Sequence, residues 1–426
     1  MKSETALAQA DATPDGLDVA PLALAKAGSG KPEATCDNVA LVLNAPQIRD
    51  AIRFEEFSQR TLVTGLMGLG YFPDGEWGEA HTTQLVQLCE RNGLNVSFAT
   101  VDRAVALQAQ KNSYNVLSDF AWGCADQWDG VARVDRAFTT YWRAEDTAAT
   151  RAASRVFFLS LLRRAFEPGS KVDTCTVFVG KQGARKSTAL EAVVGKAWFA
   201  DSPLPIGEKD GMQALPGIWL WEFQENESLS RRDAEAIKAF LSQKTDRYRP
   251  SYGRHMVTVP RQTCFASTSN SMQTLKDPTG ARRMLPVVVG AVDVEGIERD
   301  QIQLLGEAAR RVCNDERHWP TDAESTALDI IRDAHRAPDP WEAPIAAWLG
   351  DSPNLRTGFT LDEVFETETH SNKSKVAGPV PIPVERRTKA DQNRAASILR
   401  DLHKYERRRE WSEPHRGDWL WHAPGR

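Results

Sequence analysis

The sequence has few cysteines, no long apolar run and no excess of positive charge. Its six cysteines lie far apart, with no CxxC pair and no histidine-rich companion, which excludes a disulfide framework and a zinc ribbon and leaves buried free thiols. No stretch approaches the roughly 18 uninterrupted apolar residues of a membrane helix. The first residues are acidic and polar, unlike a secretory signal. We therefore expect a cytoplasmic protein without membrane contact.

The balance of charge is slightly acidic, with 53 Lys and Arg against 58 Asp and Glu and a net charge of −5. This excludes a generally basic nucleic-acid coat but not local basic patches. Hydrophobic residues make up 41% and charged residues 26% of the 426 positions, as in folded globular proteins, and the length suits about two to four domains.

The first part of the chain predicts a tail followed by helices. Residues 1–35 are rich in Ala, Pro, Gly and Asp and lack aromatics, which predicts a flexible tail. Residues 36–142 predict a mostly helical N-terminal domain: a strand and then a helix within 38–60, and two amphipathic helices within 77–115 that are separated at Asn92 and Gly93.

The rest of the chain predicts an α/β core and a small C-terminal module. Residues 143–350 begin with a strong helix and then alternate short β-rich runs with helical ones, as in a parallel sheet. Residues 351–426 predict a Pro-containing linker at 371–384, a helix at 389–405 and two short strands around Trp411 and Trp419. Such a helix and strand pair is typical of a winged-helix-like module.

A phosphate-binding loop follows the first strand of the core. The order of strand, Gly180, Lys186 and Ser187 fits the pattern G-x-x-x-x-G-K-[ST], in which backbone N–H groups and a helix N-terminus converge on phosphate oxygens. Arg185 stands where the second glycine belongs. A non-glycine residue there costs on the order of 1–3 kcal/mol if it must adopt a sparsely allowed conformation. We assign nucleotide binding to Gly180, Gly183, Arg185, Lys186, Ser187 and Thr188.

Two consequences of Arg185 stay open. The side chain either distorts the loop and abolishes hydrolysis, or is tolerated and adds a cation beside the phosphates. The remaining alternative is a chance Gly/Lys/Ser loop that binds no nucleotide.

Acidic and polar residues end two further core strands. An apolar strand at 218–221 delivers Glu222 toward Mg²⁺ and Glu225 toward the attacking water, although acids after strands are often merely solvated. The strand at 263–266 leads to Asn270, which can orient that water or sense the γ-phosphate, or is a simple polar turn. Arg282 and Arg283 are candidate arginine fingers from a neighbouring subunit, or structural ion-pair partners.

Two basic segments are candidate polynucleotide contacts. Residues 244–255 carry a net charge of +3 with interleaved aromatics, and a Pro-Ser-Tyr-Gly turn favours a β-hairpin. Residues 385–410 carry +4 on a predicted helix, which either approaches DNA or is simply solvated. The predicted hairpin contacts are Lys244, Arg247, Tyr248, Arg249, Tyr252, Arg254 and His255.

The order of these blocks resembles the virulence-associated protein E family, P-loop ATPases of phages, satellites and genomic islands that are related to superfamily 3 helicases. The resemblance rests on WDGVARVD, GKQGARKST, WLWEFQE, IKAFLSQKTDRYRPSYGRHMVTVPRQ, STSN and DPTGARRMLPV. It implies an AAA+-like core, assembly into a ring and a DNA-contacting hairpin. It also implies ATP and Mg²⁺ as cofactors, with Lys186 and Ser187 on the phosphates and Mg²⁺.

The residues and the resemblance together predict an ATP-dependent, ring-forming DNA helicase or translocase for replication of a mobile element. Its partners would be single-stranded or forked DNA, further copies in a ring, expected to be hexameric, and replication proteins of the host or element. One alternative is a hydrolysis-impaired P-loop protein that binds DNA as an initiator, loader or inhibitor. Another is a small-molecule kinase, which leaves the basic hairpin without a role.

Overall fold

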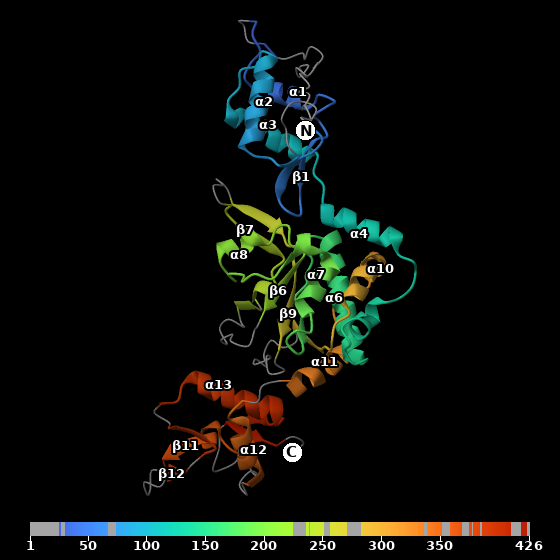
Figure 1. The fold of residues 1–426 in the computed structure, drawn as a ribbon. Coiled ribbons are helices and arrows are strands. Elements are labelled where there is room, and N and C mark those ends of the chain that lie inside the picture. Colours follow the sequence, from blue (N-terminus) through green and yellow to red (C-terminus); the bar gives the residue numbers. More distant parts are fainter. Residues whose placement is uncertain are drawn as a thin grey trace, which may run out of the picture. The chain divides into compact units, whose positions relative to one another are not determined.

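The computed structural model describes most of the chain in two compact units, Met1–Arg336 and Ala337–Arg426, which are treated separately below (Figure 1). The described residues are 25–26, 30–66, 74–224, 236–237, 239–250, 256–270, 283–335, 339–351, 358–368, 375–376, 378–383, 386–409 and 419–423. Within them no helix combines the length and the apolar character needed to span a bilayer.

The first unit begins with three helices and a small antiparallel sheet. A strand followed by a helix was predicted within 38–60, and this order is wrong: helix α1 comes first and strand β1 follows. The hydroxyl of Thr35 caps α1 by accepting from the Asn38 N–H, and a short apolar run does not distinguish helix from strand by periodicity. The two helices predicted within 77–115 are confirmed. The elements are α1 (Cys36–Leu43), β1 (Ile52–Glu55), β2 (Arg60–Val63), β3 (Gly75–Glu76), α2 (Glu79–Arg91) and α3 (Phe98–Lys111).

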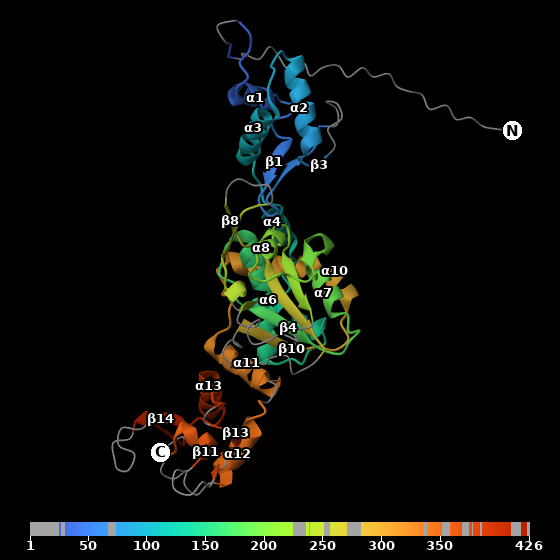
Figure 2. The same ribbon diagram turned by 90° about the vertical axis from the view of Figure 1, so that its left-hand side faces the viewer.

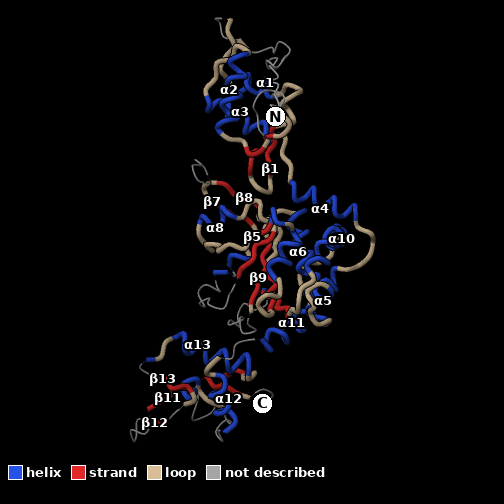
Figure 3. Tube along the Cα trace, in the orientation of Figure 1, coloured by secondary structure: helices blue, strands red, loops and turns tan. Residues whose placement is uncertain are grey.

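A five-stranded parallel sheet forms the centre of the first unit, which confirms the predicted parallel α/β region (Figure 3). The spatial order is β10-β4-β9-β6-β5, so β9 lies between β4 and β6. All five strands run in the same direction, and their carboxyl ends therefore meet at one edge. The strands are β4 (Cys175–Val179), β5 (Phe199–Ala200), β6 (Leu220–Gln224), β9 (Cys264–Ser269) and β10 (Met284–Val288).

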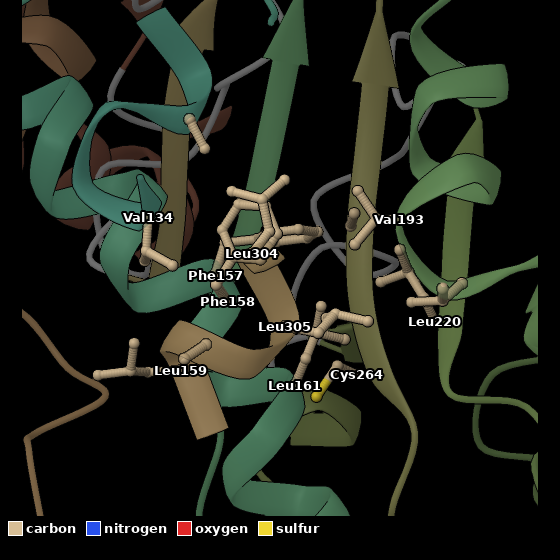
Figure 4. Packing of buried hydrophobic residues seen from close by; sticks show 14 of the residues in the cluster. Val134, Phe157, Phe158, Leu159, Leu161, Val193, Leu220, Cys264, Leu304 and Leu305 are labelled. Atoms are coloured by element: carbon tan, nitrogen blue, oxygen red, sulfur yellow. The ribbon is translucent and has the colours of Figure 1, made fainter. Parts of the chain in front are cut away.

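Both faces of this sheet are covered, so the residues of its central strands β4, β6 and β9 are almost all buried. Leu220 and Cys264 point toward a large cluster with Phe157, Leu161 and Leu304 (Figure 4). The next residues along the same two strands, Trp221 and Phe265, belong to a separate cluster on the other face. The helices of the large cluster are α4 (Val116–Gln127), α5 (Ala137–Thr140), α6 (Ala148–Phe166), α7 (Lys186–Val194), α10 (Val294–Cys313) and α11 (Asp322–His335).

The predicted hairpin is present between β6 and β9. Strands β7 (Thr245–Tyr248) and β8 (Val257–Pro260) pair antiparallel, with Thr245 opposite Pro260. The short helix α8 (Lys209–Ala214) contacts β7 (Figure 1). Figure 2 shows the same helix together with β8, the other strand of the hairpin. Only three residues separate β8 from the start of β9, so the base of the hairpin is directly connected to the central sheet.

The second unit contains the predicted helix and strand pair, but its Pro-containing segment is not a plain linker. Val380–Pro383 forms strand β13, which pairs parallel with β11 (Phe365–Glu368), and Val380 is fully buried. The winged-helix architecture is not confirmed. The other elements are α12 (Glu342–Asp351), β12 (Lys375–Val376), α13 (Lys389–Ser397), a π-helical turn (Ile398–Leu402), β14 (Glu406–Arg409) and β15 (Trp419–His422).

The division between the units falls before the predicted boundary at residue 350. Helix α11 contacts α6 and β10 and so belongs to the first unit. Ile345 of α12 instead packs with Phe359 and Trp421 in the core of the second unit. The boundary therefore follows the packing of α12, which its sequence alone does not reveal.

Candidate functional site

The predicted phosphate loop connects β4 to α7 at the carboxyl edge of the sheet. Gly180 is required there because a Cβ would lie 2.8 Å from both the Cγ2 and the carbonyl oxygen of Val289. Gly183 adopts a φ of +82°, which favours glycine. Helix α7 begins at Lys186, so its N-terminus faces the loop, as binding of phosphate oxygens requires.

The Lys186 ammonium lies inside this loop. Its Nζ donates to the carbonyl oxygens of Gly180 at 2.8 Å and Lys181 at 3.0 Å, and to Oδ1 of Asn270 at 3.1 Å. Burial lowers the pKa of Lys186, and the charge of Glu222 opposes that shift. Lys186 is thus held by three neutral acceptors, which an anion can replace.

Glu222 on β6 faces the first turn of α7. Its Oε1 accepts from Ser187 Oγ at 2.8 Å and from the hydroxyl of Thr268, while its Oε2 is buried without a hydrogen-bond partner. Burial raises the pKa of this carboxyl, and the two hydroxyl bonds oppose the shift. The side chain is 1% exposed.

This arrangement fits one divalent cation. Mg²⁺ is commonly bound by one or two carboxylates together with substrate phosphates and water, and the free Oε2 of Glu222 beside the Ser187 hydroxyl supplies the protein part of such a set. No group of three His, Cys, Asp or Glu within the described ranges could hold a metal by itself. A cation here would need ligands from a bound molecule.

Arg185 adopts the left-handed conformation that its position predicts. Its φ is +64° and its ψ +31°, and it immediately precedes α7. The guanidinium does not turn into the loop: Nη1 lies 2.7 Å from Oε1 of Glu295, in the first turn of α10. This hydrogen bond lowers the pKa of Glu295. The pair is exposed, at 47% for Arg185 and 69% for Glu295.

The remaining predicted nucleotide-site residues are distributed as follows. Asn270 follows β9 and reaches Lys186, whereas Thr188 is exposed on α7. Arg283 precedes β10, at the amino edge of the sheet, and its Nε lies 3.9 Å from Oδ2 of Asp173. Arg283 therefore lies at the edge of the sheet opposite to the one that carries the phosphate loop of the same chain. Glu225 and Arg282 lie outside the described residues.

The hairpin corrects one predicted DNA contact. Tyr248 is only 6% exposed, because it lies on the same face of β7 as the buried Asp246. Lys244, Arg247 and Arg249 are exposed. Tyr252, Arg254 and His255 lie outside the described residues.

The base of the hairpin holds a buried ion pair that sequence reasoning missed. Arg261 Nε lies 2.9 Å from Oδ2 of Asp246, and the side chains are 0% and 3% exposed. Arg261 also donates to Oε1 of Gln243 at 2.8 Å, and its guanidinium carbon lies 4.3 Å from the centre of the Phe240 ring. The sequence of β7, Thr-Asp-Arg-Tyr, has no apolar alternation, so the burial of Asp246 and Tyr248 became clear only from the structure.

Two other site residues were also missed. Thr268 was not assigned a role, although its hydroxyl donates to Glu222. Glu295 lies 110 positions from Arg185, and no local pattern joins them.

Comparison with known proteins places this site in a family. The model of the virulence-associated protein E-like domain matches residues 123–337, about half of the chain. Among solved structures, an apo structure of the NrS-1 C-terminal region has a TM-score of 0.40 at 10% identity, covering 72% of this chain and 78% of that chain. Its A form has a TM-score of 0.38 at 8% identity with the same coverage. No curated protein matches the chain in sequence.

Proposed function

The chain belongs to the virulence-associated protein E-like domain family, and on that basis we propose that it is an ATP-dependent, ring-forming DNA helicase or translocase that serves replication of a phage or other mobile element. One observation carries the proposal: Lys186, Ser187, Glu222 and Asn270 converge at the carboxyl edge of a parallel sheet. Such an edge is where open α/β sheets bind ligands. The position of β9 between β4 and β6 supports an AAA+-like core.

In this proposal Lys186 exchanges its loop carbonyls for the β- and γ-phosphates of ATP. Ser187 and the free oxygen of Glu222 hold Mg²⁺, which when bound neutralises charge on the phosphates. Asn270, released from Lys186, orients the attacking water. Arg282 or Arg283 reaches the nucleotide of a neighbouring subunit, which agrees with the distance of Arg283 from its own loop.

The DNA contact in this proposal is the outer face of the β7–β8 hairpin. Arg247 is exposed there, opposite the buried Asp246 and Tyr248 of the same strand, and Lys244 is exposed just before β7. Because exposed cations contact phosphates without reading sequence, binding would depend on salt more than on base composition.

The test is steady-state ATP hydrolysis by the full chain with Mg²⁺, with and without single-stranded DNA. Lys186→Ala should reduce turnover by at least about 100-fold, the usual effect of losing one electrostatic group at a reacting centre. Lys181→Ala is the matched control, since this exposed lysine of the same loop contributes only its carbonyl oxygen to Lys186. Wild-type turnover no higher than that of Lys186→Ala would refute the helicase.

A second function is favoured by the left-handed Arg185 and its ion pair with Glu295. A loop held in this way supports nucleotide binding without turnover, in a protein that acts on DNA as an initiator, loader or inhibitor. Hydrolysis that appears only in Arg185→Gly would establish this alternative. Equal turnover of wild type and Arg185→Gly would exclude it.

A further inference from the structure

A two-stranded ribbon in the second unit carries an exposed tryptophan beside arginines. In the pair β14–β15, Arg409 lies opposite Trp419 and Arg407 lies opposite Trp421. Residues opposite one another share a face of an antiparallel pair, as do alternate residues of one strand, so Arg407, Arg409 and Trp419 lie on one face. The guanidinium carbon of Arg407 lies 5.0 Å from the centre of the Trp419 ring.

Trp421, opposite Arg407, lies on the same face but is buried in the core of the unit, whereas Trp419 is exposed. Trp419 keeps 49% of its surface exposed, whereas the next two residues, Leu420 and Trp421, are 1% and 2% exposed. All four residues of β14 are exposed, three of them consecutive arginines. The contact of Arg407 with Trp419 and the pair of Arg408 with Glu406 both lie at the surface, where such contacts contribute at most about 1 kcal/mol each.

Helix α13 of the same unit is the weaker candidate for binding a polyanion, although it lies in the segment with the +4 charge. Arg394 pairs with Asp339 at 2.7 Å, and its guanidinium carbon lies 4.0 Å from the centre of the Trp341 ring. Arg387, which precedes the helix, pairs with Asp362. Arg387 and Arg394 are half-buried within the unit, whereas Arg407 and Arg409 are exposed on β14.

We propose that the β14–β15 ribbon is a binding site for single-stranded nucleic acid, with a base stacked on Trp419 and phosphates contacted by Arg407 and Arg409. Aromatic faces that stack bases, next to cations that follow the backbone, are the usual means of binding single strands. The site is separate from the hairpin and needs no ATP, so it stands independently of the proposed helicase activity. An anionic membrane is the weaker partner, because among the described ribbon residues Trp419 is the one exposed apolar side chain.

The experiment is fluorescence anisotropy of a labelled oligothymidylate with the full chain, without ATP. We would measure it in an Arg247→Ala background so that the hairpin does not mask the ribbon. Trp419→Ala should weaken binding by about 5- to 100-fold, the usual effect of losing one stacked base, and Trp419→Phe should restore most of it. Arg407→Ala with Arg409→Ala should reduce the slope of log K against log salt by about 1.4, since each single-strand phosphate contact contributes about 0.7.

Arg408→Ala is the matched control. Arg408 lies opposite Leu420, on the other face, and pairs with Glu406 at 2.6 Å, so its removal takes one charge from the same strand without touching the proposed site. Arg407→Ala and Arg409→Ala should each weaken oligonucleotide binding more than Arg408→Ala does. If neither does so, the proposal is overturned. The proposal would also be overturned if Trp419→Ala bound the oligonucleotide as wild type does but no longer bound phosphatidylserine vesicles. That result would identify the ribbon as a membrane contact.

Discussion

Two arginine–carboxylate pairs of the first unit differ mainly in burial, and burial decides what each can do. The side chains of Arg261 and Asp246 are 0% and 3% exposed, and Arg261 is held further by Gln243 and the Phe240 ring. Arg185 and Glu295 meet at 2.7 Å but are exposed to solvent. Removing either partner of the buried pair would leave the other charge buried without a counter-charge. Arg185, in contrast, can exchange Glu295 for water or an anion. The first pair fixes the hairpin, and the second is an exchangeable contact of the phosphate loop.

The largest effect should follow from breaking the buried pair. Asp246→Asn leaves the Arg261 guanidinium buried without a counter-charge, and such losses cost about 3–5 kcal/mol. Urea denaturation of the full chain, followed by tryptophan fluorescence, measures the change in the free energy of unfolding.

The matched control for this experiment is Glu295→Gln, which removes one carboxylate charge from the exposed pair. It should change the free energy of unfolding by less than about 1 kcal/mol, as is usual for surface ion pairs. Similar losses in both variants would show that burial does not separate the two pairs.

Glu222 is a third carboxylate for this comparison. It is buried like Asp246, but its partners are hydroxyl groups rather than an arginine. If Glu222 holds Mg²⁺, then Glu222→Gln should reduce ATP turnover by on the order of 100-fold. Hydrolysis assays at saturating Mg²⁺ test this. Undiminished turnover would remove Glu222 from the proposed site.

The same variant has an opposite effect on the empty protein. Burial raises the pKa of Glu222 above its ordinary value of 4.5, so the folded chain holds this proton at pH values where the unfolded chain has lost it. The contribution of Glu222 to stability is therefore fully present below pH 4.5 and is lost as the pH rises through the raised pKa. Without nucleotide or Mg²⁺, Glu222→Gln should gain stability relative to wild type as the pH rises from 4 to 8. If the stabilities of wild type and Glu222→Gln instead changed in parallel with pH, the pKa of Glu222 would not be raised by burial.

A smaller effect should follow from breaking the exposed pair. Glu295→Gln releases the Arg185 guanidinium for the phosphates, which should tighten binding of a fluorescent ATP analogue by about 3- to 10-fold, equivalent to roughly 1 kcal/mol. In the Arg185→Gly background the same change should have no effect, because the two residues act as one pair. Equal effects in both backgrounds would mean that Glu295 acts on the nucleotide independently of Arg185.

The parts of the site that were predicted are those encoded by contiguous residues. The loop, the buried strand that ends near Glu222 and the polar end of β9 each follow from a local pattern, and parallel strands bring such ends together. Local pattern also predicted the strained Arg185. Glu295 could not be predicted, because only the packing of α10 against α7 brings it to the loop.

The errors in the fold have the same origin. The apolar run at 38–43 fits a helix as well as a strand, and its N-cap at Thr35 decides between them. The prolines around β13 suggested a linker, yet proline is compatible with strands that are not central to a sheet. Tyr248 was chosen for its aromatic ring next to cations, although the alternation along β7 turns it inward.

The smallest effect should be that of Arg185→Gly on the free energy of unfolding. The size of this change shows how much the left-handed backbone of Arg185 destabilises the fold. Relief of the left-handed conformation should gain about 1–2 kcal/mol. Loss of the exposed pair with Glu295 and the greater freedom of glycine in the unfolded chain oppose this by about 1 kcal/mol. The free energy of unfolding should therefore change by less than about 1 kcal/mol in urea denaturation. A gain above about 2 kcal/mol would show that Arg185 is retained at a substantial loss of stability, which would point to a direct role of its guanidinium at the phosphate loop.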